Sequence, residues 1–293
     1  MLKIKNNNCK IIKRILFIFL FVSLISCASY ICFYYFINQQ RLDKKQQEIT
    51  QQLQDAKNLA ESKEAKRLEP VYISLPNTQS IKAIVSDYHQ TNNIWMLVNK
   101  TNPISTTYTP TNLKIPNIYT NPEKGDEERS VRADIEQPLI DMFAAAQADG
   151  YSLMIGSGYR PANLQSIYFN SLASSVGESI ANQSIARPGQ SEHQTGLTVD
   201  ISTVARNCYL LDCFAKTNDG IWLINNSYKF GFILRYPEGK ELITGLIYEP
   251  WHFRYIGIDL ATALYESKLT LDEAWPYLET ARNQLIANEA IVL

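Results

Sequence analysis

The stretch SEHQTGLTVDIS, from Ser191 to Ser202, places a histidine seven residues before an aspartate, with a glycine between them. Gly196 and the β-branched residues around it disfavour a helix. In a continuous strand His193 and Asp200 would point to opposite faces, because their offset is odd. The two side chains can meet only where the chain bends, and Gly196 permits a bend. The stretch therefore predicts either an ordinary strand entry or one half of a metal site.

A second stretch, YEPWHFRY (Tyr248 to Tyr255), places Glu249 three residues before His252 with a proline between them. The proline disfavours a helix interior or a central strand, so the backbone is expected to be irregular there. The two histidines His193 and His252, together with Asp200, would supply three zinc ligands and leave the fourth position open, as in catalytic sites. Glu249 could then take a proton from water and pass it to a leaving amine. These residue types predict a hydrolase.

Other routes to peptide hydrolysis find little support in the sequence. No serine is followed three residues later by lysine, which the S-x-x-K serine peptidases need, and there is no H-E-x-x-H motif. The remaining histidine, His89, lies in the polar stretch SDYHQTNN and predicts a surface role. The two downstream cysteines, Cys208 and Cys213, have no histidine near them in sequence. They are expected to close a small disulfide loop in an oxidising compartment or to remain as two thiols.

Composition narrows the classes of partner. The chain has 293 residues and a formal net charge of −1, so it lacks the excess of lysine and arginine typical of nucleic-acid binders. We therefore expect no nucleic-acid partner. The length fits one globular domain with an additional segment at one end.

The additional segment is N-terminal. Residues 15–37 carry no charge and are long enough to cross a membrane as a helix. The basic residues of segment 1–14 place the N-terminus in the cytoplasm and the rest of the chain outside, as a single-pass membrane protein. A cleaved signal peptide is the alternative, and LISC resembles a lipobox that would lipidate Cys27. The apolar run continues past Cys27, which favours an uncleaved transmembrane anchor.

Residues 38–69, rich in Gln, Lys, Glu and Ala, predict a solvated helical stalk, and residues 70–293 predict the working domain outside the cytoplasm. The domain is expected to be α+β, with helices flanking a small antiparallel sheet that carries the zinc site. Strand-like patterns occur at Asn93–Ile104, Tyr151–Arg160, Gly196–Ser202, Phe232–Tyr236, Gly245–Tyr248 and Phe253–Gly257. Helical patterns occur at Val131–Asp149, Pro161–Gly177, Thr217–Lys229, Asp259–Ser267 and Leu271–Ala290.

The motifs resemble those of a known family. SEHQTGLTVD resembles the S-x-H-x-x-G-x-x-x-D signature, and EPWH the E-x-x-H signature, of VanY-type zinc D-alanyl-D-alanine carboxypeptidases and their LdcB-like L,D-carboxypeptidase relatives. GSGYRPANLQ (Gly156 to Gln165) resembles the S-x-Y-R-x-x-x-x-Q segment of the family, and WMLVNKTNPI its N-terminal strand and loop. The four matches run in order from Ile94 to Gly257. Thr198 stands where relatives commonly have alanine, and Pro161-Ala162 where they often have Ser-Tyr.

The resemblance implies a role for each matched residue. Zinc would be held by His193, Asp200 and His252, with Glu249 as general base and then acid. Arg160 would bind the substrate carboxylate or the oxyanion, which suits its permanent charge and two-pronged donor geometry. The remaining matched residues would form the pocket for the terminal residue of the substrate: Ser191, Gln165 and Tyr159.

The implied activity is removal of the C-terminal D-alanine from peptidoglycan stem peptides, with D,D- or L,D-specificity. Stem peptides and the membrane are the expected partners. Two alternatives remain at this stage. One is a peptidoglycan endopeptidase of the same fold, and the other is a non-catalytic wall-binding protein.

Overall fold

In the computed structural model of the chain, residues 2–68, 70–83 and 93–290 are described. They form two compact units, one of residues up to Glu69 and one that begins at Pro70. His89 lies outside the described residues, so its predicted surface role stays a prediction.

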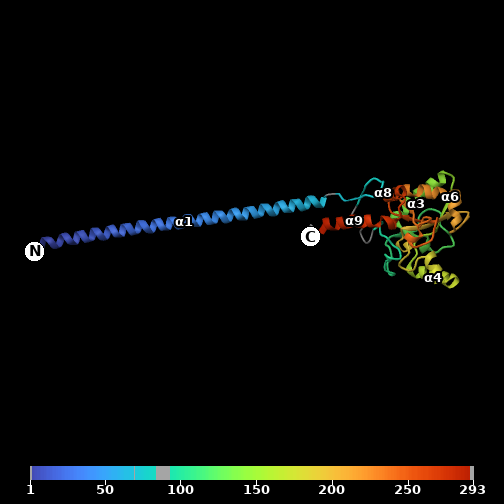
Figure 1. The fold of residues 1–293 in the computed structure, drawn as a ribbon, viewed down its shortest axis with the longest axis horizontal. Helices are drawn as coiled ribbons and strands as arrows, with labels where there is room; N and C mark the ends of the chain where they lie inside the picture. Colours follow the sequence, from blue (N-terminus) through green and yellow to red (C-terminus); the bar gives the residue numbers. More distant parts are fainter. Residues whose placement is uncertain (1, 69, 84–92, 291–293) are drawn as a thin grey trace. The chain divides into compact units, whose positions relative to one another are not determined.

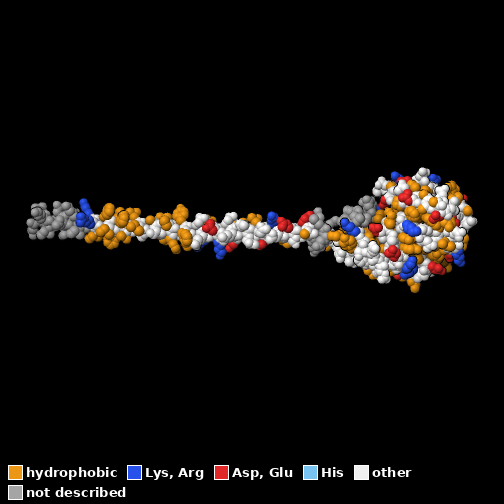
Figure 2. Space-filling view, turned by 90° about the horizontal axis from the view of Figure 1, so that it is seen from above, with side chains coloured by type: hydrophobic (Ala, Val, Ile, Leu, Met, Phe, Trp, Pro, Cys, Tyr) orange, Lys and Arg blue, Asp and Glu red, His pale blue; other side chains and the backbone are white. Residues whose placement is uncertain are grey.

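The first unit is a single long helix, α1 (Leu2–Leu68), which appears at full length in Figure 1. Its apolar side chains from Ile12 to Phe36 are exposed, and Figure 2 shows hydrophobic side chains gathered along one part of the helix, next to basic ones. The helical conformation expected for the stalk is thus present over residues 38–68. A helix of this length and composition could cross a membrane.

The second unit is built on a four-stranded antiparallel sheet with the order β5–β6–β8–β7. Its strands are β5 (Leu153–Ser157), β6 (Thr198–Thr203), β7 (Phe232–Leu234) and β8 (His252–Tyr255). Because each strand pairs with an antiparallel neighbour and helices pack against the sheet, the expected α+β class is confirmed.

The two faces of this sheet differ in chemistry. One face carries buried apolar residues such as Val199 and Phe253, which pack against helices α3 (Glu136–Ala148) and α6 (Asn218–Asn226). The opposite face carries polar residues, because side chains alternate along each strand. The strand β6 contributes Asp200 to this polar face. The chemistry predicted from the motifs therefore lies on the face turned away from this core.

A second apolar core lies beside the sheet. Helices α8 (Ile258–Ser267) and α9 (Leu271–Ala290) pack there with the hairpin of β1 (Tyr72–Ile73) and β2 (Ile81–Lys82). The indole of Trp95 is buried in the same cluster, and its Nε1 donates a 2.8 Å hydrogen bond to the carbonyl of Ile256.

The other helices and strands connect these cores and border the site. In Figure 1 the longest of them, α4 (Ala162–Val176), lies on the opposite side of the domain from α6 and α8. The remaining short elements are β3 (Leu113–Lys114), α2 (Asp126–Arg129), β4 (Val131–Arg132), η2 (Ala133–Ile135), α5 (Glu178–Ser184), η3 (Glu192–Thr195), η4 (Asp212–Lys216), η5 (Ser227–Phe230) and α7 (Glu241–Thr244).

Three local predictions were wrong. Asn93–Ile104 is not a strand, because its backbone is irregular. Two of its carbonyls, those of Ile94 and Met96, accept hydrogen bonds from the side chain of Arg254. Gly245–Tyr248 is not a strand either, since the chain leaves α7 there through a left-handed Gly245. The helix expected to begin at Val131 begins only at Glu136, because Val131 and Arg132 pair with β3 instead.

Cys208 and Cys213 form a disulfide, as one of the two sequence expectations had it. The backbone at and just before this disulfide loop is unusual, because Arg206, Cys208 and Leu210 have positive φ angles although each carries a side chain. Such backbone is costly for residues other than glycine, so the surrounding contacts must hold it. The covalent link between Cys208 and Cys213 is one such constraint.

We expect Phe253→Ala to lower the free energy of unfolding by about 3–5 kcal/mol, because the side chain is fully buried and its loss would leave a cavity under β8. Leu242→Ala, at a fully exposed leucine, serves as the control and should change stability by less than about 0.5 kcal/mol. Urea unfolding of the full chain in detergent would measure both. Equal losses in the two variants would contradict the assignment of the core.

Candidate metal centre and substrate pocket

Strand register brings two of the predicted ligands together. Asp200 on β6 lies directly opposite His252, the first residue of β8. Paired residues of antiparallel strands share a face, so both side chains lie on the polar face of the sheet. On the other side of β6, a bulge in β5 shifts the register so that Ser157 also pairs with Asp200. Three neighbouring strands thus converge on one polar spot.

His193 reaches the same spot by a turn of the backbone. It lies in the 3₁₀ turn η3. This turn ends at Gly196, which has a left-handed backbone conformation with a φ of 69°. This conformation reverses the chain before β6 begins, so the odd spacing between His193 and Asp200 no longer separates their side chains. The bend inferred from the sequence is therefore present at Gly196.

The three side chains form a compact, buried group. One ligand atom from each of His193, Asp200 and His252 lies within 4.8 Å of the other two. His193 Nε2 is 3.3 Å from Asp200 Oδ2, and His252 Nδ1 is 3.4 Å from Asp200 Oδ1. Asp200 Oδ1 is buried and accepts no hydrogen bond from the described residues. Because an orphaned buried carboxylate oxygen is costly, this donor set fits a cation.

The orientation of His193 is set by the loop after β5. Its Nδ1 lies 2.7 Å from the carbonyl oxygen of Gly158, so Nδ1 carries the proton and Nε2 presents its lone pair. Gly158 is held tightly, because a Cβ at this position would collide with the carbonyl oxygen of Ser130. Gly158 of the GSGYR segment therefore allows close backbone packing beside His193.

Glu249 lies in the irregular segment before β8, as its neighbouring proline predicted. Its Oε2 is 3.2 Å from His252 Nδ1, and the side chain is about nine-tenths buried. Burial raises the pKa of Glu249, which outweighs the lowering by the hydrogen bond from His252. A carboxyl group with a raised pKa beside a metal-binding cluster suits proton transfer.

Arg160 lies at the wall of the cluster. Its Nη2 is 3.4 Å from Asp200 Oδ2 and donates to Ser157 Oγ at 3.0 Å, while its Nη1 donates to Gln165 Oε1 at 3.0 Å. Gln165 in turn donates to the carbonyl of Ala186 at 2.6 Å. These contacts hold the guanidinium in one orientation beside the ligands.

These side chains border a cavity of about 170 Å³, with a size suited to a small terminal residue. Among the described residues, its lining includes Ser191 and Gln165 but not Tyr159. Tyr159 is buried, and its backbone N–H donates to the carbonyl of Ser130. The lining comprises Arg160, Gln165, Ser184, Ile185, Ala186, Ser191, His193, Asp200, Leu210, Tyr236, Leu246, Glu249, Trp251 and His252.

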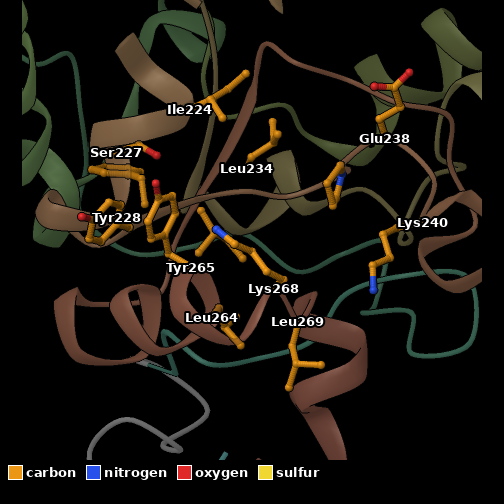
Figure 3. A pocket seen from close by; sticks show the side chains of 13 residues that line it. Ile224, Ser227, Tyr228, Leu234, Glu238, Lys240, Leu264, Tyr265, Lys268 and Leu269 are labelled. Atoms are coloured by element: carbon orange, nitrogen blue, oxygen red, sulfur yellow. The ribbon is translucent and has the colours of Figure 1, made fainter. Parts of the chain in front are cut away.

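A larger cavity of about 290 Å³ lies elsewhere on the same domain and is mainly apolar (Figure 3). In it, the rings of Tyr228 and Tyr265 stack with centroids 3.9 Å apart, and Lys268 Nζ lies 4.1 Å from the centre of the Tyr265 ring. None of the motif residues lines it. This cavity is larger than the one at the motif residues, and a third hollow of about 410 Å³ is larger than both, so the ionisable groups that line the smallest of the three assign the site, and size does not.

Electrostatics distinguish the two histidines. Burial lowers the pKa of His193. Burial also acts to lower the pKa of His252, yet the nearby carboxylates of Asp200, Glu192 and Glu249 raise it well above its usual range. Burial would raise the pKa of Asp200, but the neighbouring histidines hold it below its usual range. The raised pKa of His252 therefore reflects the carboxylates gathered around its ring.

The sequence motifs did not single out Glu192, Tyr236 or Arg235. The Tyr236 ring lies 4.7 Å from the His252 ring and lines the cavity. Glu192 is fully buried and pairs with Arg235 and Arg254; burial would raise its pKa, but the two guanidinium groups hold it far below its usual range. The sequence did contain one indication of Glu192, because Arg235 and Arg254 stand among apolar residues and buried charges of this kind need buried partners.

Comparison with known proteins agrees with this geometry. Residues 128–258 match the VanY family, described as D-alanyl-D-alanine carboxypeptidase. YodJ of Bacillus subtilis (strain 168), named as a candidate carboxypeptidase, is 42% identical over 181 residues, which cover 62% of this chain and 66% of that protein. The chain thus spans about two thirds of YodJ. The bifunctional D-Ala-D-Ala dipeptidase and carboxypeptidase VanXYC of Enterococcus gallinarum is 32% identical over 64% of this chain and 95% of that protein.

Two solved structures are similar as well. The LdcB LD-carboxypeptidase aligns with a TM-score of 0.60 and 38% identity, covering 71% of this chain and 94% of that one. A mutant of the vancomycin-resistance D,D-pentapeptidase VanY, in complex with Zn(II), aligns with a TM-score of 0.52 and 35% identity, covering 62% of this chain and 98% of that one.

These similarities define the class of protein, an enzyme of the metallopeptidase type. The chain belongs to the VanY family of D-alanyl-D-alanine carboxypeptidases. The resemblance inferred from the four motifs is therefore confirmed.

Zinc affinity should rise with pH. Zinc binds neutral imidazole, and the raised pKa of His252 keeps that ring protonated above the ordinary value of 6.5 in the metal-free protein. Each pH unit below the pKa of His252 should therefore weaken binding about tenfold, as one proton is released per ion bound. Competition with a chromophoric chelator between about pH 6 and 8 would measure this. An affinity independent of pH over that range would contradict the prediction.

Proposed function

We propose that this protein is a zinc-dependent carboxypeptidase that removes the C-terminal D-alanine from peptidoglycan stem peptides. The observation that supports it most strongly is the convergence of His193, Asp200 and His252 beside the buried carboxyl group of Glu249. The neighbours LdcB and VanY carry the names of an LD-carboxypeptidase and a D,D-pentapeptidase, which supports a peptidase activity of one of these two specificities.

The donor set suits zinc. Two imidazoles and one carboxylate are typical zinc ligands, and a catalytic site keeps a further position open. When bound, zinc supplies a Lewis acid at the scissile carbonyl and makes the attacking water more acidic. We propose His193 Nε2, His252 Nδ1 and a carboxylate oxygen of Asp200 as the ligand atoms.

Glu249 moves the proton. We propose that Glu249 Oε2 takes a proton from the attacking water while the water oxygen bonds to the carbonyl carbon. The C–N bond to D-alanine then breaks, and Glu249 gives the proton to the departing nitrogen. Because its pKa is raised, Glu249 holds the accepted proton more readily than an exposed glutamate and can return it to the departing nitrogen.

Arg160 selects a free carboxylate. Its charge and fixed orientation favour a substrate whose last residue ends in the cavity. We propose that Ser191 and Gln165 bound the same end of the pocket. A closed end of this kind favours a carboxypeptidase over an endopeptidase, which would need a groove open at both ends.

Glu249→Gln should lower kcat for D-alanine release by about 10²- to 10⁴-fold, because the amide cannot accept the proton, while zinc content is retained. Release from defined penta- and tetrapeptide stems would be measured with the zinc-loaded full chain in detergent. Glu238→Gln makes the same change at an exposed glutamate and should leave kcat within about twofold.

The alternatives have separate outcomes in this assay. An endopeptidase would cleave stems whose terminal carboxylate is amidated as well as the free acids, whereas the proposed enzyme should prefer the acids by about 10- to 100-fold. A wall-binding protein without activity would bind zinc and stem peptides and release nothing. Equal D-alanine release by Glu249→Gln and by the unchanged protein would refute the proposed mechanism.

We further propose that residues 15–37 of α1 anchor the protein in the cell membrane and that the domain from Pro70 acts outside the cytoplasm. The exposed apolar side chains of α1, visible in Figure 2, support the anchor. The basic residues Lys13 and Arg14 precede them in the sequence and support this orientation. The substrate of the proposed reaction is also extracytoplasmic.

The anchored form should remain in the membrane pellet after carbonate extraction, and protease added to spheroplasts should degrade the domain from Pro70. A chain cleaved and lipidated at Cys27 would differ in mass, because it would lack the residues before that cysteine. Recovery of the intact chain in the soluble fraction would argue against both forms of anchoring.

A further inference from the structure

Glu192, immediately before the ligand His193, lies at the centre of a buried ionic cluster. Its Oε1 accepts hydrogen bonds from Arg235 Nε at 2.8 Å and from Arg254 Nη1 at 2.9 Å. All three side chains have no exposed surface. Both guanidinium groups bind the same oxygen, so the rotation of the carboxylate is restricted and Oε2 points elsewhere.

The cluster is tied to distant parts of the domain. Arg235 Nη1 donates to Asp272 Oδ2 at 2.6 Å, at the start of α9. Arg254 Nη2 donates to the carbonyls of Ile94 and Met96 at 2.9 and 2.8 Å. Two guanidinium groups thus face two carboxylates, which balances the buried charge and holds Glu192 in place.

The second oxygen of Glu192 faces a proposed zinc ligand. Oε2 is 3.9 Å from His252 Nε2 and accepts a 3.4 Å hydrogen bond from Thr198 Oγ1. His252 Nε2 is buried and makes no hydrogen bond within the described part of the chain. The opposite ring nitrogen, Nδ1, faces Asp200 and Glu249. The carboxylate and the proposed metal position therefore lie on opposite sides of one imidazole ring.

We propose that Glu192, clamped by Arg235 and Arg254, is a positioning residue that accepts the Nε2 proton of His252 and so directs the Nδ1 lone pair of this ring to zinc. The inference rests on the zinc site of the proposed function. A carboxylate behind a ligating imidazole fixes its tautomer and increases its basicity. His193 has the reverse arrangement, because the carbonyl of Gly158 holds the proton on Nδ1.

Glu192→Gln tests this role with little change in size. Its oxygen can still bind the two arginines, but its NH₂ group would then face the Nε2 proton of His252 and could not accept it. We expect zinc affinity to fall about 10- to 100-fold, measured by chelator competition on the full chain in detergent. Glu192→Asp keeps a carboxylate acceptor but moves it away from the His252 ring. Its zinc affinity should therefore lie between those of the unchanged protein and Glu192→Gln.

Asp272→Asn is the matched control, since it removes a carboxylate charge on the other side of the same Arg235. It should leave zinc affinity within about threefold, and thermal melting of the metal-free proteins would record any loss of stability in both variants. Equal losses of zinc affinity in Glu192→Gln and Asp272→Asn would show a merely structural role and overturn the proposal. Unchanged affinity in a folded Glu192→Gln would overturn it too.

A measurement on the unchanged protein covers the case in which Glu192→Gln does not fold. The chain has three histidines, so nitrogen NMR of the imidazoles in the zinc-loaded protein gives few signals. We expect His252 to be protonated on Nε2 and His193 on Nδ1. Protonation of His252 on Nδ1 would refute the inference.

Failure of the proposed activity would give a different result. Neither zinc affinity nor the imidazole spectrum requires a substrate. A protein that shows the expected tautomers and the Glu192 dependence, yet releases no D-alanine, would contradict the carboxypeptidase proposal alone. Loss of the Glu192 dependence with D-alanine release intact would contradict the positioning role alone.

Discussion

The pairing of Asp200 with His252 across β6 and β8 is the constraint on which the site depends. It sets two ionisable side chains on the same face of the sheet. The next paired residues along the two strands, Val199 and Phe253, face the apolar core. A shift of one residue in this register would move Asp200 into that core. The same strand pairing therefore determines both the packing of the apolar face and the meeting of Asp200 with His252.

Buried charge on the polar face imposes a second requirement. The group of His193, Asp200 and His252 lies next to the ionic cluster around Glu192, and both groups are buried. Isolated buried carboxylates would be strongly unfavourable, so each must meet a cation or a hydrogen-bond donor. Arg235 and Arg254 meet this need for Glu192, and the donor set of Asp200 and the histidines suits a metal ion. The buried charges of the polar face thus find their partners in two neighbouring groups of side chains.

Local spacing predicted which side chains come together. The bend at Gly196 followed from the conflict between an odd offset and strand alternation, and the irregular backbone before His252 followed from the proline beside Glu249. The strand expected at Asn93–Ile104 was wrong, because its alternation reflects burial against α8 and α9 rather than pairing. Its carbonyls are satisfied by an arginine side chain from β8, a partner about 160 residues away that local pattern cannot supply.

The order of residues alone predicted a group of two histidines and one aspartate beside a glutamate, and the α+β class, because these depend on side-chain chemistry and short-range backbone geometry. Folding alone decided which oxygen of Glu192 faces His252, where Tyr159 lies and which cavity holds the chemistry. These features depend on contacts between segments far apart in the chain. Strand register and helix packing set such contacts, and no short stretch contains the information for them.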